Sequence, residues 1–482
     1  MKKTTFQFIP ILLFLAACGN EPAQKTSNNS IAPENATEAN LPPATYLEGA
    51  YATSNTVGKG LENLFDSNPA TQWQSLPGTG PDEGIMLYFQ NALPLASVEI
   101  IAAEGSFAKD LPQNEAPIVV YTNGQVANSG HPNARIAVEQ NGLVKSLFIR
   151  FSATGKEETE TLRAGVNRSS YPADAFIAIS DLKVVTDKGE TLRLVPPQRI
   201  KGSITASSML APEVAYSPAN LFDSRKEFAW AEAAVSSGEG ETLTFEFGEP
   251  VNITAIQIWN GYQRSDEHFS ANTRLRDFDF GENGGTTRTY TLRDTKAGQK
   301  IELQAPAKGS SFALKIKSVY PGKRYKDLAI SDILFFNGAQ PFVLHSTLPE
   351  KYQAALRSKG AGSPIATLLD KRISNQVSED VSEGDNFLTS NSLILRSDGT
   401  FVYYSENSSG GNLDISSIAD GNWEMLSSAQ IKVFGKWTDQ VNWPEYYKGN
   451  TPQSPTRIFN DVLTIDAQKV IGTKMMGTFY LK

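Results

Sequence analysis

Residues 63–67 read Asn-Leu-Phe-Asp-Ser and are followed by Trp73, and residues 220–224 read the same five letters and are followed by Trp230. The step from the Asn to the Trp is ten residues in both places. A second shared stretch lies downstream, because Ala-Ile-Ser-Asp at 178–181 recurs at 329–332. The chain therefore contains one module twice, and each copy of roughly 140 residues has the size of a domain rather than of a solenoid repeat.

Each copy shows the pattern of short strands. Apolar and polar residues alternate over four to six positions, and Gly, Pro and Asn separate these segments. The alternation predicts half-buried antiparallel strands at 85–89, 98–100 and 147–151 in the first copy and at 243–247, 256–258 and 312–316 in the second. We expect no helix within either copy, and two sheets packed face to face as a β-sandwich. Trp73 and Trp230 are expected in the two cores.

These landmarks resemble the discoidin family, also called the coagulation factor 5/8 C-terminal type, whose members are jelly-roll β-sandwiches that bind carbohydrates and cell surfaces. Over about 203–336 the second copy is similar to the NADase-type glycan-binding branch, through Asn-Gly-Tyr-Gln at 260–263, Tyr-Pro-Gly-Lys-Arg-Tyr at 320–325 and Ile-Ser-Asp at 330–332. The first copy, at about 46–186, has Ala-Ala-Glu-Gly at 102–105 instead of the first of these motifs. The resemblance therefore favours the second copy as the binding module.

A glycan site is predicted on the loops of the second copy. Sugars present hydroxyl groups around an apolar ring face, so their sites combine an aromatic ring with amide, carboxylate or guanidinium groups. Loops on a rigid sandwich commonly carry such groups. The predicted glycan-binding residues are Asn260, Tyr262, Gln263, Arg264, Tyr320, Arg324 and Tyr325. In the alternative interpretation, Tyr320-Pro321 shapes a turn and Asn260-Gly261 caps a strand.

The Asp turn of the first copy is a predicted metal site. The discoidin resemblance implies a structural calcium ion held by the Asp loop and by an acidic residue near the last strand. The first copy offers the oxygen ligands that calcium prefers on Asp66, Asn68, Thr71 and Asp181. The alternative is an Asx turn without metal. The second copy keeps Asp223 and Asp332 but has Lys226 in that loop, where an ammonium group can replace a cation.

The pattern changes after Phe336. Residues 348–374 predict two short helices, interrupted by Gly-Ala-Gly-Ser-Pro at 360–364. The strands that follow are joined by Asp-Gly and by Ser- and Asn-rich turns, which predicts an antiparallel meander. Its order is similar to small lipocalin-like barrels, so 340–482 is predicted as a helical segment plus a lipocalin-like β domain. Such a barrel either holds a small apolar ligand or is filled by its own side chains. The predicted fold class is all-β.

The N-terminus predicts a membrane anchor. Two lysines at 2–3 precede an apolar run at 6–14, and Leu-Ala-Ala-Cys follows at 15–18. This resembles a bacterial lipoprotein signal peptide over 1–18, and the run is too short to span a bilayer. Cys18, which is the only cysteine of the chain, would carry the lipid that holds the protein to the membrane. The alternative is a free thiol behind an uncleaved anchor.

The residues after Cys18 indicate where the anchored protein lies. Gly19, with no Asp at that position, favours the outer membrane in the lipoprotein pattern and leaves the leaflet open. Residues 19–44 are rich in Asn, Ser, Thr, Pro, Ala and Glu and predict a flexible stalk. We therefore expect the modules to be held off the membrane in the cell envelope.

Composition and motifs narrow the function. The net charge of −8, the pI of about 5.2 and the absence of a Lys/Arg cluster argue against nucleic acid and against a polybasic membrane patch. The histidines are scattered at His131, His268 and His345, and we find no nucleophile motif, zinc pattern or phosphate loop. We predict no catalytic residues and no enzyme.

The sequence is most consistent with a lipid-anchored carbohydrate-binding or adhesion protein outside the cytoplasm, with a glycan as its partner. Two alternatives remain. One is an envelope enzyme with a C-terminal active site, to which the sandwiches deliver substrate. The other is a structural envelope lipoprotein whose sandwiches contact other proteins.

Overall fold

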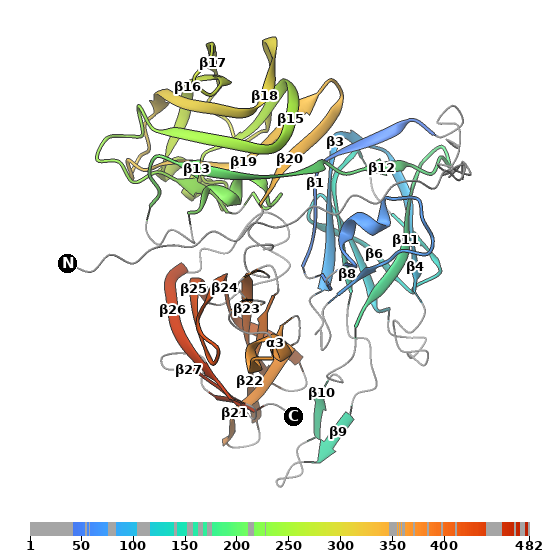
Figure 1. The fold of residues 1–482 in the computed structure, drawn as a ribbon. Helices are drawn as coiled ribbons and strands as arrows, with labels where there is room; N and C mark the ends of the chain where they lie inside the picture. Colours follow the sequence, from blue (N-terminus) through green and yellow to red (C-terminus); the bar gives the residue numbers. More distant parts are fainter. Residues whose placement is uncertain are drawn as a thin grey trace, which may run out of the picture. The chain divides into compact units, whose positions relative to one another are not determined.

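The computed structural model describes residues 42–346, except 54, 57, 76–82, 104–115, 139–141, 152–157, 162–166, 171–175, 211–215 and 227. Beyond them it describes 354, 356, 358, 362–369, 372–382, 385–396, 399–409, 412–439, 456–466, 469–472 and 478–480. These residues are mostly β-strands (Figure 1), which confirms the predicted all-β class. None of the helices among them is long and apolar enough to cross a membrane. The predicted signal peptide with Cys18, and the predicted stalk up to residue 41, lie outside the described residues.

The first copy is a sandwich of two layers whose strands pair antiparallel, except for the parallel edge pair of β1 with β12. One sheet has the order β12-β1-β3-β8-β5-β6 and the other β2-β11-β4-β7. The strands of the first sheet are β1 (Ala44–Ala52), β3 (Glu83–Leu93), β5 (Ile118–Thr122), β6 (Gln125–Gly130), β8 (Val144–Phe151) and β12 (Arg193–Val195). Those of the second are β2 (Trp73–Gln74), β4 (Leu95–Ala102), β7 (Arg135–Ala137) and β11 (Ala178–Thr186), and β9 (Glu158–Thr161) pairs with β10 (Asn167–Ser170) apart from both.

The second copy has longer strands, and they hydrogen-bond in one eight-stranded sheet instead of two separate ones. Its sheet order is β14-β19-β20-β13-β15-β18-β16-β17, and β19 pairs additionally with β15 and β16. The strands are β13 (Gln198–Ala206), β14 (Trp230–Ala231), β15 (Thr242–Asn260), β16 (Thr273–Glu282), β17 (Thr287–Thr291), β18 (Gln299–Tyr320), β19 (Leu328–Asn337) and β20 (Gln340–Ser346). The predicted strands 243–247 and 256–258 both belong to β15, because its pairing with β18 continues through two register shifts, between Glu246 and Val251 and between Ile253 and Ala255.

The prediction that neither copy contains a helix is wrong for the second copy. Helix α1 (Asp266–Ala271) lies between β15 and β16. The Ser265 hydroxyl caps this helix by accepting a hydrogen bond from the backbone N–H of His268, and Asp266 and Glu267 place negative charge in its first turn. Both features stabilise a helix N-terminus, even in a segment too short to show helical periodicity.

Each core is built from the inward-facing residues of the alternating strands. In the first copy Ile85, Leu87 and Phe89 of β3 are fully buried, as is Trp73. In the second copy Phe245 and Trp230 are fully buried. The two tryptophans therefore lie in the cores, as the sequence predicted.

The repeated Asn-Leu-Phe-Asp-Ser stretch builds the same loop twice. The loop contains the 3-10 turn η2 (Leu61–Leu64) in the first copy and the 3-10 turn η3 (Pro218–Phe222) in the second. Asn63 donates from Nδ2 to the carbonyl oxygen of Gln72 at 2.8 Å, and Asn220 donates in the same way to Ala229 at 3.0 Å. Each bond spans nine residues and ties the loop to the residue before the buried Trp, so the sequence repeat is also a repeat of local structure.

The C-terminal region is one antiparallel sheet whose eight strands follow in chain order. They are β21 (Arg372–Ser382), β22 (Asp385–Leu395), β23 (Thr400–Ser409), β24 (Asn412–Ser427), β25 (Gln430–Asp439), β26 (Thr456–Ile465), β27 (Lys469–Gly472) and β28 (Thr478–Tyr480). This order confirms the predicted meander. The second predicted helix is α3 (Pro364–Leu368), and most of the first lies outside the described residues. Buried aromatic rings of Phe401, Tyr403, Trp423, Trp437 and Phe459 pack into one core.

Candidate functional site

Asn260, the first predicted glycan ligand, lies at the end of β15 with no exposed surface. Its Nδ2 donates to the carbonyl oxygen of Leu275 at 2.6 Å, and its Oδ1 accepts from the backbone N–H groups of Leu275 at 2.9 Å and of Gly261 at 3.0 Å. Gly261 has a φ of +72°, and a Cβ there would lie 2.7 Å from the ring of Phe269. The Asn-Gly pair therefore fastens β15 to β16, in agreement with the capping interpretation.

The next three predicted ligands are also buried, with exposed fractions of 8% for Tyr262, 8% for Gln263 and 6% for Arg264. Gln263 donates from Nε2 to the carbonyl oxygens of Asn260 at 3.1 Å and Lys296 at 2.7 Å. Its amide nitrogen thus holds the 260–264 segment in shape.

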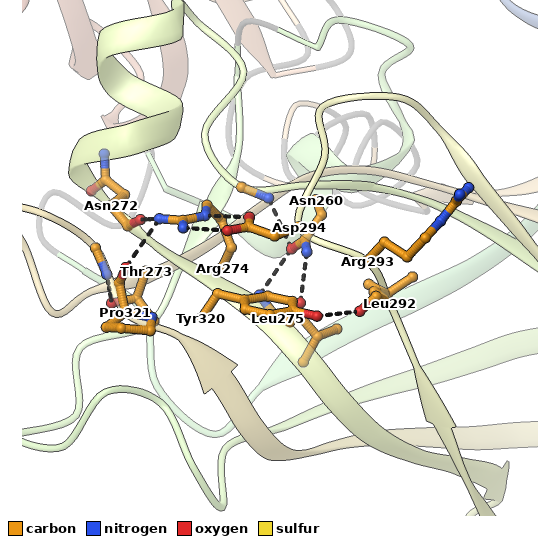
Figure 2. A network of polar contacts seen from close by, with 12 residues as sticks. Asn260, Asn272, Thr273, Arg274, Leu275, Leu292, Arg293, Asp294, Tyr320 and Pro321 are labelled. Atoms are coloured by element: carbon orange, nitrogen blue, oxygen red, sulfur yellow. Dashed lines mark hydrogen bonds and ion pairs between the residues drawn. The ribbon is translucent and has the colours of Figure 1, made fainter.

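A buried arginine that the sequence analysis did not select organises the same end of the sandwich (Figure 2). Arg274 binds both carboxylate oxygens of Asp294, from Nε at 2.8 Å and from Nη2 at 2.7 Å. Its Nη1 donates to the carbonyl oxygens of Asn272 at 2.8 Å and Pro321 at 3.3 Å. One guanidinium therefore ties three segments that are far apart in the chain, using the planar fork that suits bidentate pairing.

Tyr320 also points inward in this network, because its hydroxyl donates to the carbonyl oxygen of Leu292 at 2.9 Å (Figure 2). Its side chain is half-buried at the end of β18. The contact fixes the strand that leads into the 321–327 segment, which we call the recognition loop.

The backbone of the recognition loop is held against the end of α1. The N–H of Lys323 donates to the carbonyl oxygen of Ser270 at 3.0 Å, and the N–H groups of Arg324 and Tyr325 donate to that of Ala271 at 3.0 and 2.8 Å. These bonds satisfy carbonyl groups that a helix C-terminus leaves without intrahelical partners. The loop is thereby ordered by main-chain contacts.

Thr273 and Gly322 complete this anchoring. The hydroxyl of Thr273 accepts from the N–H of Gly322 at 3.3 Å and donates to the carbonyl oxygen of Tyr325 at 3.2 Å. A Cβ on Gly322 would lie only 2.4 Å from the carbonyl oxygens of Ala271 and Tyr325. Only glycine fits this close approach of loop and helix.

The two remaining predicted ligands, Arg324 and Tyr325, are exposed on the recognition loop. Tyr325 keeps 42% of its surface accessible, which makes it one of the few large apolar side chains exposed in the described residues. The guanidinium carbon of Arg324 lies 5.1 Å from the centre of the Tyr325 ring. An aromatic ring and a planar cation are thus presented together on a fixed backbone.

Further aromatic side chains gather around Tyr262, and we call Tyr216, Tyr262 and His268 the aromatic cluster. The Tyr262 ring lies edge-on to Tyr216 at 6.4 Å and to His268 at 5.2 Å. Burial raises the pKa of Tyr216 to about 12, with smaller effects from Tyr262, Arg264, Asp327 and Tyr325. These electrostatic neighbours connect the aromatic cluster to the recognition loop.

His268 is the titratable member of the aromatic cluster. Burial lowers its pKa below the usual 6.5, and the positive charge of Arg264 lowers it further. The charge of Glu267 opposes these two effects, and the net result favours the neutral ring. Its Nδ1 lies 2.7 Å from the Ser265 hydroxyl. The sequence analysis missed Tyr216 and His268 as neighbours of this site, although the Ser-Asp-Glu start at 265–267 signals the helix that carries His268.

Three of the four predicted calcium ligands, Asp66, Asn68 and Thr71, form a closed turn. The Oδ1 atom of Asp66 accepts from the N–H of Asn68 at 2.8 Å, and its Oδ2 accepts from the Thr71 hydroxyl at 2.8 Å. The Asn68 side chain accepts from the N–H of Ala70 at 3.1 Å, and Asp181 lies half-buried in β11. Within the described residues no three His, Cys, Asp or Glu side chains form a metal-binding group. These contacts fit an Asx turn, and calcium stays a prediction.

Comparison with known proteins concerns mainly the second copy. Residues 198–336 match the family model of the NAD glycohydrolase translocation F5/8 type C domain. The match confirms the predicted resemblance of this copy to an F5/8 type C domain. Comparison of the chain with curated proteins gave no match.

Several solved structures are similar to parts of the chain. The CBM32 module of AlyQ, in complex with 4,5-unsaturated mannuronic acid, is 15% identical over 28% of this chain and 94% of its own, with a TM-score of 0.21. The paired CBM32-1 and CBM32-2 domains of ZmpB from Clostridium perfringens are 11% identical over 60% of this chain and 92% of their own, with a TM-score of 0.23. The family 32 module of NanJ from C. perfringens, in complex with galactose, is 12% identical over 28% and 93%, with a TM-score of 0.23.

Proposed function

We propose that this chain is a carbohydrate-binding protein, and that the recognition loop and the aromatic cluster of the second sandwich hold the glycan. The observation that carries the proposal is the pairing of exposed Tyr325 with Arg324 on a loop whose backbone is already fixed. A ring and a hydrogen-bonding cation match the apolar face and the polar groups of a sugar. A loop ordered before binding also loses less conformational entropy when the ligand arrives.

The seven predicted residues then have two different roles. Arg324 and Tyr325 contact the sugar directly. Asn260, Gln263 and Tyr320 position the segments from beneath, since their hydrogen bonds go to backbone groups. Tyr262 and Arg264 form the floor, where only their edges reach the surface. The match of 198–336 to an F5/8 type C domain supports this proposal, because the discoidin resemblance implies carbohydrate binding.

The remaining parts of the proposal concern the chain outside this site. We propose that Cys18 is lipidated and tethers the protein to the cell envelope, on the outer membrane. The role is binding or adhesion and includes no catalysis. For the C-terminal sheet we propose a lipocalin-like fold filled by its own side chains, which is supported by the buried aromatic residues of its core.

A glycan array probed with the full-length protein tests the binding site. Tyr325→Ala should weaken the strongest glycan signal on the order of tenfold, since residues central to a binding site commonly contribute more than 1 kcal/mol. Tyr325→Phe should keep most of the signal because it keeps the ring. Both variants should melt like the wild type, as exposed loop substitutions cost within about 0.5 kcal/mol.

Leu426→Ala serves as the control, because Leu426 is also an exposed apolar residue, 48% accessible, and lies in the C-terminal sheet. It should leave glycan binding unchanged. If Tyr325→Ala binds every glycan as well as the wild type does, the recognition loop is not the sugar site.

A further inference from the structure

The recognition loop is strongly basic within an acidic protein. The chain has 52 Asp and Glu against 44 Lys and Arg, a net charge of −8. Within the seven residues 321–327, however, Lys323, Arg324 and Lys326 stand against one acid, Asp327. All three cations are exposed, and none of them forms an ion pair within the part of the chain that the structure describes. This group is not evident from the sequence, because Tyr325 separates Lys326 from the other two cations and because their exposure depends on how the loop is anchored.

Three acidic side chains around the loop are engaged in contacts of their own, whereas Glu267 of α1 and Asp327 of the loop have no ion pair among the described residues. Asp266 at the start of α1 pairs with Lys296 at 2.7 Å, and Asp294 pairs with Arg274 at 2.7 Å. Glu232 is fully buried and accepts hydrogen bonds from the N–H groups of Ala234 and Leu328. These three acids therefore do not neutralise the loop cations, which outnumber the single acid of the loop, Asp327.

We infer that the glycan bound by the recognition loop is acidic, and that its carboxylate or sulfate group meets Arg324 while its ring lies against Tyr325. This inference rests on the proposed function and names the class of sugar. The distance of 5.1 Å between guanidinium and ring lets one charged sugar residue reach both side chains. A guanidinium fork binds two oxygens of a carboxylate or sulfate at once, which a neutral sugar does not offer. Lys323 and Lys326 add attraction that salt screens.

The test compares charged and neutral versions of the same sugar, with the full-length protein in detergent. The probes are an oligogalacturonate, its carboxyl-reduced neutral counterpart and a sulfated galactan oligosaccharide. We expect at least one anionic probe to bind about tenfold or more tightly than the neutral one, as for a hydrogen bond to a charged group. Added salt should reduce this preference.

Arg324→Ala should remove most of the preference for the anionic sugar, whereas Arg324→Lys, which keeps the charge but not the fork, should retain part of it. The matched control is Lys308→Ala, another exposed cation, which lies in β18. It should leave the preference intact. An equal loss in Lys308→Ala would mean that net charge alone attracts the probes, and would overturn the inference.

Other outcomes separate this inference from the proposed function. Equal binding of the neutral and anionic probes, lost in Tyr325→Ala, would overturn the inference and leave carbohydrate binding standing. If no oligosaccharide on the array or among the probes binds, both fail. Tighter binding of phosphatidylglycerol vesicles than of neutral phosphatidylcholine vesicles, lost in Arg324→Ala and without binding of any oligosaccharide, would assign the loop to anionic lipid instead and would also overturn the inference.

Discussion

At the scale of single residues, burial strongly perturbs the carboxyl group of Asp332. It is 4% exposed in β19, and its Oδ1 accepts from the N–H of Ile333. Burial raises its pKa well above the usual 3.8, the charge of Asp223 raises it further, and Lys226 opposes both. The folded protein therefore binds this proton more tightly than the unfolded chain does.

The expected consequence is a stability that falls as pH rises above the unfolded pKa of 3.8. In that range the unfolded chain has lost a proton that the folded state still holds, so unfolding is favoured. Asp332→Asn cannot ionise. We expect its melting temperature to rise relative to that of the wild type as the pH is raised above the unfolded pKa, measured by calorimetry at closely spaced pH values.

Asp277→Asn is the matched control with the opposite sign. Hydrogen bonds from Ser318 and Thr291 lower the pKa of Asp277, so the wild type should gain stability over this variant as pH rises. A loss of stability in Asp332→Asn relative to the wild type at higher pH would contradict the proposed cost of burying that charge.

Single residues also show where sequence reasoning succeeds and where it stops. Trp73 and Trp230 were placed correctly in the cores, because a large apolar side chain at a fixed distance from a turn has few other places to go. Asn260 looked like a ligand since it is polar and follows a strand. Its burial depends on Leu275, fifteen residues later, whose backbone N–H and C=O match the side-chain amide. Neither periodicity nor composition reveals such a pairing.

At the scale of elements, the two Asp turns share one backbone and differ in charge. Ser67 and Ser224, which follow the two aspartates, have φ angles of +59° and +61°. In the second turn the charge of Lys226 lowers the pKa of the buried Asp332. The equivalent position in the first turn is Pro69, which carries no charge. The turn of the first sandwich has no ammonium group to balance its carboxylate, so a bound cation would stabilise it more than the second turn. Calcium is therefore predicted for the first sandwich.

Calcium should therefore raise the melting temperature of the first sandwich in the full-length protein. A ligand that binds only the folded state adds about 2.7 kcal/mol at a hundred times its Kd. Calorimetry in calcium and in chelator should show one transition that shifts. Asp66→Ala should abolish the shift, and Asp223→Ala, which removes the equivalent turn carboxylate, should retain it. Identical melting curves in millimolar calcium and in chelator would argue for the metal-free Asx turn.

Elements were predicted best where their sequence pattern was local. The strands of both sandwiches and the C-terminal meander followed from alternation and turn residues. Helix α1 was missed because six residues show no helical period, although Ser265 and the acidic first turn mark its start. The positive charge of the recognition loop could not be predicted from the sequence. It depends on the exposure of the loop cations, and that exposure follows from the anchoring of 321–327 on α1.

At the scale of the whole molecule, the predicted anchor decides where the binding modules work. Cys18→Ser should leave an unlipidated precursor, because only the thiol accepts the diacylglyceryl group. The variant should not be labelled by fatty acid and should be absent from the membrane fraction. Ser27→Ala, in the predicted stalk, should behave like the wild type in both measurements. A Cys18→Ser protein that still labels with fatty acid would rule out the lipoprotein assignment.

The contacts that fix the backbone of the recognition loop do not involve the side chains that the loop exposes. The hydrogen bonds that hold 321–327 come from main-chain groups, Thr273 and Arg274, and none uses the side chains of residues 323–326. Those side chains can therefore be exchanged while the loop keeps its course. A combinatorial library at these four positions should therefore fold like the wild type, and selection from it on glycans would show whether the loop sets the proposed specificity.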